Sequence, residues 1–580
     1  MARANQEVAA LLREYAELTS ITGGDPFRVR NYERAAGSVA GYSGDVEVLD
    51  AAGLRKIPGV GKSIADKIVE FTEGGTFAAL EELRAKVPAG VRELTRVPAL
   101  GPRRAFQLYT ELGVTSLGEL SEAVRAGKLR ELKGFGAKSE ERILHGIELA
   151  SQTGQRVKLN VAMETATALV SALRAVAGCL RCDYAGSLRR MAETIGDVDI
   201  LAAAEDSAPL MAAFVQQPQV AEVIVSGPAK TSVRTTAGLQ ADLRVVPLDC
   251  WGAAMQYFTG SKAHNVATRS IAVRKKLKLS EYGLFHADTD ELIVSRTEEE
   301  VYARLGMAWI PAPMRENTGE IEAALAGELP RLVCVDDIRG DLHTHTNLTD
   351  GVASLADMVA AAAKRGYQYY AITDHAPDLV MQRMTDEKML AQREQVAALA
   401  DRLAQQGGGR GAMTLLHGTE LNIAPDGTVD WDADFLAGFD IRVASVHSHF
   451  GQPRAEMTRR FLRACENPFV NIIGHPLTRK IGRRAPVDVD LGELFRACAA
   501  TGTALEINAY PDRLDLPGEH IRAARDAGVK FAISTDSHSI AHLGFMPYGI
   551  GTAQRGWLTA EDVINTWPLA RLREFLRKGH

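Results

Sequence analysis

The chain has 580 residues, of which 46% are hydrophobic and 24% are charged, and its formal net charge is −6. This length exceeds what one hydrophobic core can organise, so we expect about three to five domains. No apolar run approaches the roughly 18 residues of a membrane span, the first residues lack the apolar segment of a secretory signal, and the six cysteines are too few for a disulfide framework. We therefore expect a cytoplasmic protein with no membrane partner.

Residues 1–155 are rich in Ala, Leu, Glu and Arg at helical spacing, and apolar-glycine turns interrupt them at 57–62, 97–102 and 132–138. Glycine allows a sharp turn, and the free backbone N–H groups that begin the next helix can hold a phosphate without reading sequence. One such turn is an ordinary helical hairpin, whereas three with nearby basic residues favour DNA binding, in spite of the negative net charge. We predict helical domains at 1–85 and 86–155, with DNA contacts from Gly59, Gly61, Lys62, Gly101, Arg103, Gly134, Gly136 and Lys138.

Two carboxylates, Asp197 and Asp199, alternate at the start of an apolar run. Residues two apart on a strand point to the same face, so both leave one face of a predicted sheet. A third carboxylate, Asp242, lies in another strand-like run, and such a set of hard oxygen ligands suits Mg²⁺ or Mn²⁺. A lone Asp-X-Asp would indicate solvent-facing residues of an edge strand. The third aspartate and the small turn at Gly186 and Ser187 favour a two-metal site for phosphoryl transfer instead.

The order Gly-Ser-X-Arg-Arg at 186–190, Gly-Asp-Val-Asp at 196–199 and Asp-X-Arg at 242–244 resembles the palm of nucleotidyltransferases. Tyr-Phe-Thr-Gly-Ser at 257–261, followed by Asn265 and Arg269, resembles the nucleotide-binding segment of family X DNA polymerases. The resemblance implies an α+β nucleotidyltransferase palm at 156–250, a nucleotide-selection subdomain at 251–320 and a linker at 321–334.

The same resemblance implies roles for individual residues. Asp197 and Asp199 would bind both catalytic metal ions, and Asp242 would bind one of them and activate the primer 3′-hydroxyl. The triphosphate would be held by Gly186, Ser187 and Arg190. The sugar would lie against Tyr257, Phe258 and Gly260, and the minor groove of the nascent base pair would be reached by Asn265 and Arg269.

Residues 335–580 alternate short strand-like runs with alanine-rich helices, which is the pattern of parallel βα units. Of the 14 histidines, only His145, His264 and His286 precede residue 340. Several of the strand-like runs end on His, Asp or Glu, and the carboxyl ends of the strands in a βα barrel converge on one mouth. One buried histidine is usually a hydrogen-bonded core residue, but this repetition predicts a metal centre.

The motifs His-X-His at 343–345, Thr-Asp-His at 373–375, Gly-X-Glu at 418–420, Val-His-Ser at 446–448, Gly-His-Pro at 474–476 and Ser-Thr-Asp-Ser-His at 534–538 resemble the PHP (polymerase and histidinol phosphatase) family. The resemblance implies a distorted (β/α)7 barrel that binds three ions, for which mixed nitrogen and oxygen ligands suit Zn²⁺ or Mn²⁺. Their ligands would be His343, His345, Glu420 and Asp536 for one ion, Glu420, His447 and His475 for another, and Asp350, His375 and His538 for the third. The expected activity is that of a 3′-5′ exonuclease, AP endonuclease or phosphoesterase.

The glycine turns resemble helix-hairpin-helix motifs, and the first helical domain resembles the 8-kDa domain of family X polymerases. Lys67 falls where some members carry a Schiff-base lysine that removes 5′-deoxyribose phosphate, although a solvated helix lysine fits this position as well. The whole order resembles bacterial family X DNA polymerases, which implies a monomer that fills short gaps in gapped or nicked DNA with dNTPs during repair. Two alternatives remain: a DNA-end-processing nuclease with a weak polymerase half, and a non-catalytic scaffold for DNA ends.

Overall fold

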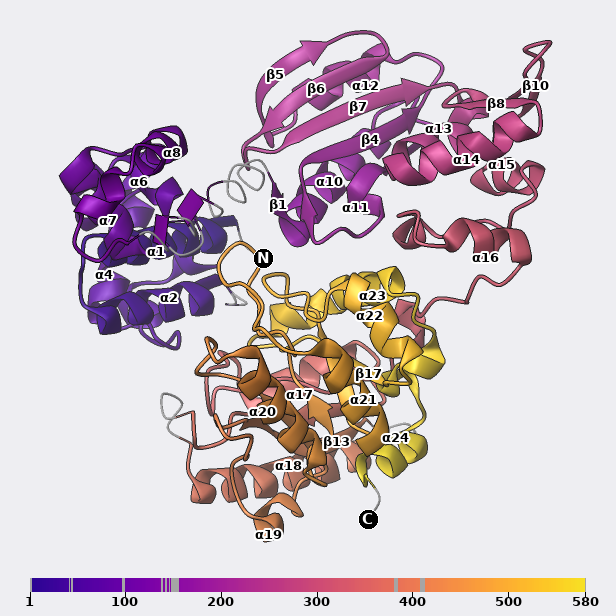
Figure 1. Ribbon diagram of the computed structural model, residues 1–580. Coiled ribbons are helices and arrows are strands. Elements are labelled where there is room, and N and C mark those ends of the chain that lie inside the picture. The colour runs from indigo at the N-terminus through magenta and orange to yellow at the C-terminus, as the bar shows by residue number, and fades with distance from the viewer. Residues whose placement is uncertain are drawn as a thin grey trace.

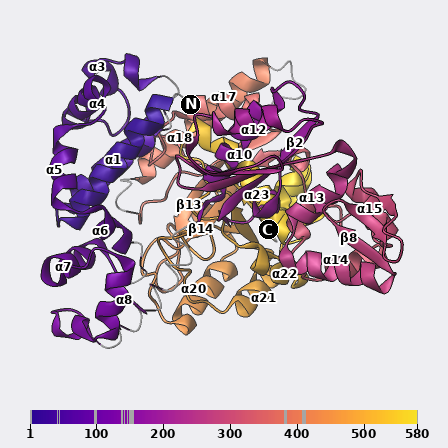
Figure 2. The ribbon, with the colours of Figure 1, turned by 90° about the horizontal axis from the view of Figure 1, so that it is seen from above.

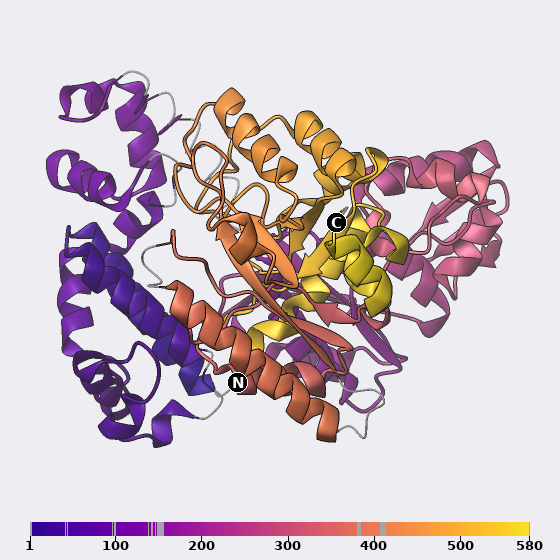
Figure 3. The same ribbon diagram turned by 90° about the horizontal axis from the view of Figure 1, so that it is seen from below.

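The chain forms helical units, an α+β unit built on a sheet, and a parallel barrel, in that order along the sequence (Figure 1). The computed structural model describes residues 3–40, 42, 45–95, 97, 100–136, 139–140, 143–144, 147, 156–379, 384–406 and 413–578. The helical units lie to one side of the sheet and the barrel in all three views (Figures 1, 2 and 3). This arrangement confirms the predicted multidomain fold class. No helix within the described residues is long and apolar enough to cross a bilayer.

Two separate hydrophobic cores organise the N-terminal helices. The first core extends from Val8 to Val91 and the second from Leu94 to Ile147, so the change of core falls a few residues after the predicted boundary at 85. The helices are α1 (Arg3–Ile21), α2 (Pro26–Ala40), α3 (Ala51–Leu54), α4 (Lys62–Gly74), α5 (Ala78–Lys86), α6 (Ala89–Leu94), α7 (Pro102–Leu112) and α8 (Leu117–Arg125).

The first two glycine turns lead directly into helices. Gly61 and Gly101 occupy the positions just before α4 and α7, and no side chain caps either helix start. The first backbone N–H groups of α4 therefore remain available to an acceptor such as a phosphate. In α7 the first such donor is the N–H of Arg103, because Pro102 has none. The third turn contains Gly134 with φ +92°, and Lys138, which was predicted to contact DNA beyond it, lies outside the described residues.

The palm is a five-stranded sheet of order β2-β4-β7-β6-β5. Alternation along β4 divides its two faces: Val198, Ile200 and Ala202 enter the hydrophobic core with residues of α10 and α12, while Asp197 and Asp199 take the other face. The strands are β2 (Arg181–Tyr184), β4 (Asp197–Ala203), β5 (Val220–Ser226), β6 (Lys230–Thr235) and β7 (Gln240–Val246), and the helices are α10 (Leu159–Arg174), α11 (Gly186–Arg189) and α12 (Ala208–Val215). A small pair, β1 (Val157–Lys158) and β3 (Thr194–Ile195), lies beside them.

The nucleotide-selection subdomain has its own core. It consists of α13 (Trp251–Thr259), α14 (Lys262–Arg274), β8 (Leu277–Ser280), β9 (Gly283–His286), β10 (Leu292–Val294), α15 (Glu298–Arg304) and α16 (Glu320–Ala326). The segment predicted as a linker, 321–334, therefore begins inside α16. Ile321 and Ala324 are buried in this core, so the apolar face of the helix, which sequence inspection left unassigned, makes it part of the subdomain.

The C-terminal domain is a sheet of seven parallel strands in sequential order, β11 to β17. A parallel bridge between Thr344 and Ser537 brings the chain after β11 beside the chain after β17, so the sheet nearly closes into a barrel. The strands are β11 (Gly340–Asp341), β12 (Tyr369–Ile372), β13 (Thr414–Asn422), β14 (Ile441–Ser445), β15 (Ile472–Ile473), β16 (Ala504–Asn508) and β17 (Phe531–Ser534). The helices are α17 (Leu355–Lys364), α18 (Asp386–Gln406), α19 (Ala433–Leu436), α20 (Arg454–Glu466), α21 (Leu491–Thr501), α22 (Gly518–Asp526), α23 (Met546–Arg555) and α24 (Leu569–Leu576).

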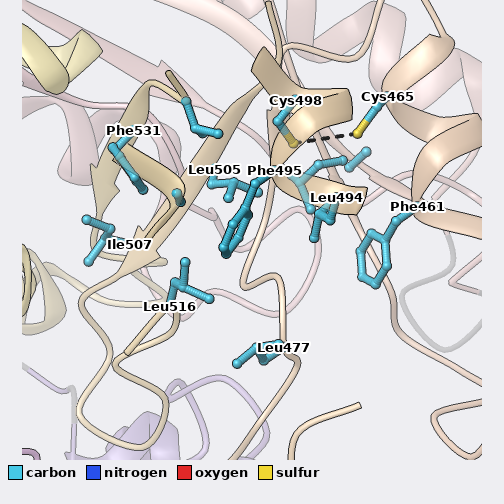
Figure 4. Close-up of a cluster of buried hydrophobic side chains, with 14 of the residues drawn as sticks. Phe461, Cys465, Leu477, Leu494, Phe495, Cys498, Leu505, Ile507, Leu516 and Phe531 are labelled. Atoms are coloured by element: carbon cyan, nitrogen blue, oxygen red, sulfur yellow. Dashed lines mark hydrogen bonds between the residues drawn. The ribbon is translucent and has the colours of Figure 1, made fainter. Parts of the chain in front are cut away.

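Figure 4 shows the core between the barrel strands and two of their covering helices. Leu505 and Ile507 of β16 face Leu494 and Phe495 of α21 across it. Cys465 and Cys498 lie in the same layer with their sulfur atoms 3.7 Å apart (Figure 4). The hydrogen bond with Cys465, together with burial, raises the pKa of the Cys498 thiol well above its usual value. The two cysteines therefore pack in the core as small apolar side chains.

The barrel packs directly on the polymerase-like units. Leu514, from the loop after β16, is buried in the palm core, and Trp557 is buried in the core of the nucleotide-selection subdomain. Arg479 of the barrel binds Glu193 of the palm at 2.6 Å. Since hydrophobic and ionic contacts both cross this boundary, the two units have a fixed orientation in this structure.

Candidate active sites

The palm aspartates gather near the start of β4 and β7, two neighbouring inner strands of the sheet. The parallel register of β4 with β7 places Asp199 opposite Asp242, and Asp197 shares the face of Asp199. Burial, together with the charges of Asp197 and Asp242, raises the pKa of Asp199 to about 6. This concentration of negative charge is the condition that a divalent cation relieves, and oxygen donors alone fit Mg²⁺ or Mn²⁺.

Asp242 has a basic partner that the sequence did not suggest. Lys230, on the neighbouring strand β6, has its Nζ 2.6 Å from Oδ2 of Asp242, and Gln240 donates to Oδ1 at 3.0 Å. Burial opposes ionisation of Asp242, but hydrogen bonds from Lys230, Ser232 and Gln240 outweigh it and lower the pKa. Only cross-strand pairing brings Lys230 to this carboxylate, and that pairing has no local sequence signal.

The turn at Gly186 lies against the aspartates. Gly186 has φ +62°, and a Cβ built there would lie 2.3 Å from Oδ2 of Asp199. Only glycine lets the backbone approach this closely in this conformation. Ser187 follows directly, so the backbone predicted to hold a triphosphate adjoins the predicted metal ligands.

Arg190 is engaged by protein acceptors. Its Nη1 donates to the carbonyl of Thr259 at 2.6 Å, and its Nε lies 3.1 Å from Oε1 of Glu316. A Cβ at Gly260 would lie 3.3 Å from Nη1 of Arg190. The structure thus brings together Arg190 and Gly260, two residues that were predicted to contact the nucleotide.

The aromatic pair of the nucleotide-selection subdomain lies at the end of α13. Tyr257 and Phe258 meet edge to face with ring centroids 5.1 Å apart, and Arg269 lies 5.9 Å from the ring of Tyr257. Asn265 is buried, donating to the carbonyl of Tyr257 at 2.7 Å and accepting from Gln256 at 2.9 Å. A contact between Asn265 and a DNA groove would require these bonds to open.

Sequence inspection missed a buried polar chain in this subdomain. The ring nitrogens of His264 lie 2.7 Å from Glu320 and 2.8 Å from the hydroxyl of Tyr302. Glu320 also accepts from the backbone of Asn317 and Thr318. These residues tie α14, α15 and α16 together, and their wide spacing along the chain explains why no motif revealed them.

In the barrel, the predicted ligands converge on Glu420. Its Oε1 lies 3.1 Å from Nε2 of both His447 and His475, and its Oε2 lies 2.9 Å from Nδ1 of His375 and 3.4 Å from Nε2 of His343. Burial opposes ionisation of Glu420, but the adjacent His447, His343 and His375 outweigh it and hold its pKa well below the usual value. Glu420 therefore occupies the centre of the cluster as a carboxylate.

Asp350 and Asp536 complete the cluster on its other side. Oδ2 of Asp350 lies 3.3 Å from His375 and 3.2 Å from His538, and Oδ1 of Asp536 lies 3.2 Å from His345. Within the described part of the chain, three sets have ligand atoms within 4.8 Å of one another: His345, Asp350, His375 and His538; His343, His345 and Asp536; and His375, Glu420 and His447. The palm aspartates form no set this tight in that part of the chain.

This grouping resembles the predicted one but is not identical to it. His345 and His375 each belong to two sets, and His475 belongs to none of the three but has its Nε2 3.1 Å from Glu420. Nε2 of His343 and Nε2 of His345 face each other at 3.2 Å, and Nδ1 of His475 is buried with no hydrogen-bond partner among the described residues. Imidazole nitrogens that face one another, with carboxylates beside them, fit Zn²⁺ or Mn²⁺.

Further residues, which sequence inspection missed, orient the ligands. Glu506 accepts from Nδ1 of His343 at 2.7 Å and from the backbone of His475 at 2.6 Å. Asn422 lies 2.8 Å from Nδ1 of His447. Such partners set the tautomer and direction of a ligating imidazole. The sequence did contain a signal for Glu506 and Asn422, because β13 and β16 both end in Glu-X-Asn, at 420–422 and 506–508.

Lys67 lies in a small basic and aromatic group of the first helical domain. Its Nζ is 3.2 Å from the hydroxyl of Ser63 and 5.8 Å from the ring centres of both Tyr15 and Tyr32. Arg28 donates to the Tyr15 hydroxyl. The amine thus lies over two aromatic rings, and the Arg28 guanidinium lies over the same two rings.

Four family profiles match this chain. They are a helix-hairpin-helix domain at residues 3–77, a SAM-like helix-hairpin-helix tandem at 91–148, the DNA polymerase beta thumb at 254–316 and the PHP domain at 341–509. The DNA polymerase/3′-5′ exonuclease PolX of Bacillus subtilis (strain 168) is 35% identical over 577 residues, which cover 99% of each chain.

Two further relatives each match only a part of this chain. A probable phosphatase of Shewanella sediminis (strain HAW-EB3) is 29% identical over 250 residues, 41% of this chain and 94% of its own. DNA polymerase lambda of Rattus norvegicus is 26% identical over 317 residues, 49% of this chain and 52% of its own.

Proposed function

Because this chain belongs to the family X DNA polymerases that carry a C-terminal PHP domain, we propose that it extends DNA 3′ ends at the palm and trims them in the barrel. The register that sets Asp199 opposite Asp242, beside the turn at Gly186, carries the synthetic half of this proposal. The convergence of barrel histidines on Glu420 supports the hydrolytic half. The substrates are DNA and dNTPs, and the preferred DNA is a short gap or a nick.

At the palm, Asp197, Asp199 and Asp242 would hold the catalytic cations. Mg²⁺ or Mn²⁺ there would supply the positive charge that activates a primer 3′-hydroxyl and stabilises the leaving pyrophosphate. Asp242, paired with Lys230 at 2.6 Å, remains ionised at neutral pH.

The nucleotide would be held by the chain around these aspartates. The backbone at Gly186 and Ser187, with Arg190, would hold the triphosphate, and Tyr257, Phe258 and Gly260 would line the sugar. Asn265 and Arg269 would act on the nascent base pair, Asn265 through the carbonyl of Tyr257 that it holds.

At the barrel, the ligands would be His343, His345, Asp350, His375, Glu420, His447, His475, Asp536 and His538. Zn²⁺ or Mn²⁺ there would supply Lewis-acid activation of water and of the phosphoryl group. Glu506 and Asn422 hold the imidazoles of His343 and His447 in position. We assign to this centre the removal of 3′ nucleotides, with abasic sites and 3′-phosphates as further candidate substrates.

The helical units would supply sequence-independent affinity for the DNA backbone. The uncapped starts of α4 and α7, with Lys62 and Arg103 beside them, fit this role. We propose that a single chain binds one DNA end, with domains near the limits 1–85, 86–155, 156–250 and 335–580.

The test is extension and digestion of a duplex with a one-nucleotide gap, with Mg²⁺ and with Mn²⁺. Asp199→Ala should abolish extension and retain digestion, and His343→Ala should do the reverse. Extension that survives loss of Asp199 would show that the palm assignment is wrong. Digestion alone by the wild type would indicate a nuclease, and DNA binding without either reaction would indicate a scaffold.

Lyase activity at Lys67 is a separate proposal. The hydroxyl of Ser63 and the rings of Tyr15 and Tyr32 hold this amine in place, and a lysine amine so positioned could attack the aldehyde of an incised abasic site. Borohydride trapping on DNA with an incised abasic site should yield a covalent adduct with the wild type and none with Lys67→Ala. Equal adduct formation by both proteins would exclude Lys67 as the nucleophile.

A further inference from the structure

Two loops at the mouth of the barrel carry a group of cations that are not among the residues of the centre described above. One loop follows β15 and holds Lys480 and Arg484, and the other follows β16 and holds Arg513. Both leave the carboxyl ends of their strands, the end at which the metal ligands lie. We call Lys480, Arg484 and Arg513 the basic rim.

Hydrogen bonds between the two loops fix the relative position of the residues of the basic rim. The backbone N–H of Ile481 donates to the carbonyl of Asp512 at 2.7 Å, and Nε of Arg479 donates to the carbonyl of Arg513 at 2.9 Å. Lys480 and Arg484 form an antiparallel bridge within their own loop. The positions of the three cations are therefore set by backbone contacts.

The rim adjoins the ligand cluster directly. Nε of Arg513 lies 3.7 Å from Oδ2 of Asp536, although the Arg513 side chain is only 15% exposed. Its Nη1 is buried and has no hydrogen-bond partner in the described part of the chain. A buried guanidinium nitrogen without an acceptor is costly unless a ligand supplies one.

The other two cations are partly buried and lie close to Arg513. Arg484 donates to the carbonyl of Thr478 at 2.8 Å and lies 4.1 Å from the ring centre of Phe450. Burial and the charge of Arg513 lower the pKa of Arg484 to about 10, and burial, followed by the charges of Arg513 and Arg484, lowers the pKa of Lys480. These cations repel one another in a partly desolvated place.

Two acidic residues near the rim attract its cations, because the charge of Asp512 favours the charged form of Lys480 and the charge of Asp515 favours that of Arg484. Both acidic residues also have other partners. Asp512 pairs with Lys158 of the palm, and Asp515 accepts from the backbone N–H of Leu477 at 3.0 Å. Arg479, from the loop that carries Lys480, binds Glu193 of the palm at 2.6 Å. The rim therefore lies on the side of the mouth that contacts the palm.

We propose that Lys480, Arg484 and Arg513 form a phosphate subsite that holds the backbone of the strand whose 3′ end occupies the barrel centre. This inference rests on the proposed nuclease function. The scissile phosphodiester lies at the metal ligands, and the phosphates on its 5′ side lie along the rim. A strand leaving the palm thus meets positive charge before it reaches the ligands.

The test compares Lys480→Gln and Arg484→Gln with Arg496→Gln, which removes an exposed arginine from the outer helix α21. For each protein, kcat/KM for single-stranded DNA is divided by kcat/KM for bis(p-nitrophenyl) phosphate, a diester with no flanking phosphates. We expect this ratio to fall about tenfold in each rim variant and to stay at the wild-type value in the control. Arg484→Lys should recover part of the loss.

A second measurement does not depend on catalysis. Binding of a short single-stranded oligonucleotide to chelator-treated protein is followed against salt concentration. The slope of log affinity against log salt should become shallower by about 0.7 in each rim variant, the value for one lost phosphate contact on a single strand. Metal content and thermal unfolding check that the variants are intact.

Two results would overturn the subsite. One is an unchanged salt slope in both rim variants. The other is an equal fall for DNA and the small diester, which would indicate damage to the metal centre. Failure of the wild type to digest DNA would overturn the proposed nuclease function instead. The salt dependence of oligonucleotide binding would then still test the phosphate subsite.

Discussion

Arg555 of the barrel helix α23 binds Glu316, at the end of the nucleotide-selection subdomain, at 2.8 Å. The same nitrogen donates to the carbonyl of Arg190 at 2.9 Å, and Glu316 pairs with the Arg190 guanidinium at 3.1 Å. A residue of the barrel domain is thus in direct contact with the arginine proposed to hold the incoming triphosphate, and it shares the carboxylate of Glu316 with that arginine. The barrel and the palm are therefore physically linked at the proposed nucleotide site.

Arg555→Gln should weaken nucleotide binding. Loss of this partner leaves Glu316 and Arg190 to rearrange, so KM for dNTP in gap filling should rise about threefold to tenfold, with a smaller change in kcat. Steady-state kinetics on a one-nucleotide gap measures this. The control is Arg571→Gln on α24, which breaks an exposed ion pair between Arg571 and Glu561. Equal KM values for the two variants would contradict the link.

Gly186→Ala should disable the polymerase and spare the nuclease. The added methyl group would lie 2.3 Å from Oδ2 of Asp199 and would move that carboxylate. A displacement of about 1 Å at reacting groups costs on the order of a hundredfold in rate. Gly178→Ala is matched for backbone strain, since Gly178 has φ +90° and no neighbouring atom within 4 Å of a Cβ. Similar extension rates in the two variants would show that the close approach has no catalytic role.

Glu298 should make the free energy of unfolding depend on pH in the acidic range. Burial opposes its ionisation, but Arg315 and Arg189 outweigh burial and lower its pKa to about 2. A carboxyl whose pKa is lower in the folded state contributes stability above its unfolded pKa, near about 4.3, and this contribution is lost as pH falls from there toward 2. The contribution is on the order of 3 kcal/mol.

The measurement is the melting temperature of wild type and Glu298→Gln between neutral pH and pH 3.5. The difference in melting temperature between the two proteins should be largest at neutral pH, where the variant leaves Arg315 buried with a weaker partner. This difference in melting temperature should become smaller as the pH falls below about 4.3. A difference that stays constant over this range would contradict the assignment.

Glu506→Gln should weaken metal binding in the barrel. Glu506 accepts from Nδ1 of His343 at 2.7 Å, and a carboxylate in this position raises the basicity of a ligating imidazole. We expect the affinity for Zn²⁺ or Mn²⁺, measured by calorimetry, to fall about tenfold to a hundredfold. Glu519→Gln, on the exposed start of α22, should bind as the wild type does, and an unchanged affinity in Glu506→Gln would exclude this role.

Local patterns predicted much of both sites. Period-two alternation placed Asp197 and Asp199 on one face of a strand, and β4 has that strand geometry. Histidines and carboxylates at the ends of short buried runs predicted a barrel mouth, and the residues around Glu420 do meet there. The predicted directions of these side chains agree with the structure because the direction of a side chain follows from its position within a strand, which is local information.

Residues that act through partners far along the chain were not predicted. Lys230 reaches Asp242 by cross-strand pairing, Glu506 reaches His343 across the barrel, and Arg555 reaches Glu316 across a domain boundary. The α16 helix was placed in a linker for the same reason, because its burial depends on His264 and Tyr302 in α14 and α15.

The sequence by itself determined the residue types and periodicities, and hence the strands, the helices and the chemical character of both centres. The tertiary structure alone decided which charges are paired, which are left without an acceptor as in Arg513, and how the barrel meets the palm. The physical reason is that secondary structure arises from contacts between near neighbours, whereas electrostatic pairing and desolvation depend on groups that only the folded chain brings together.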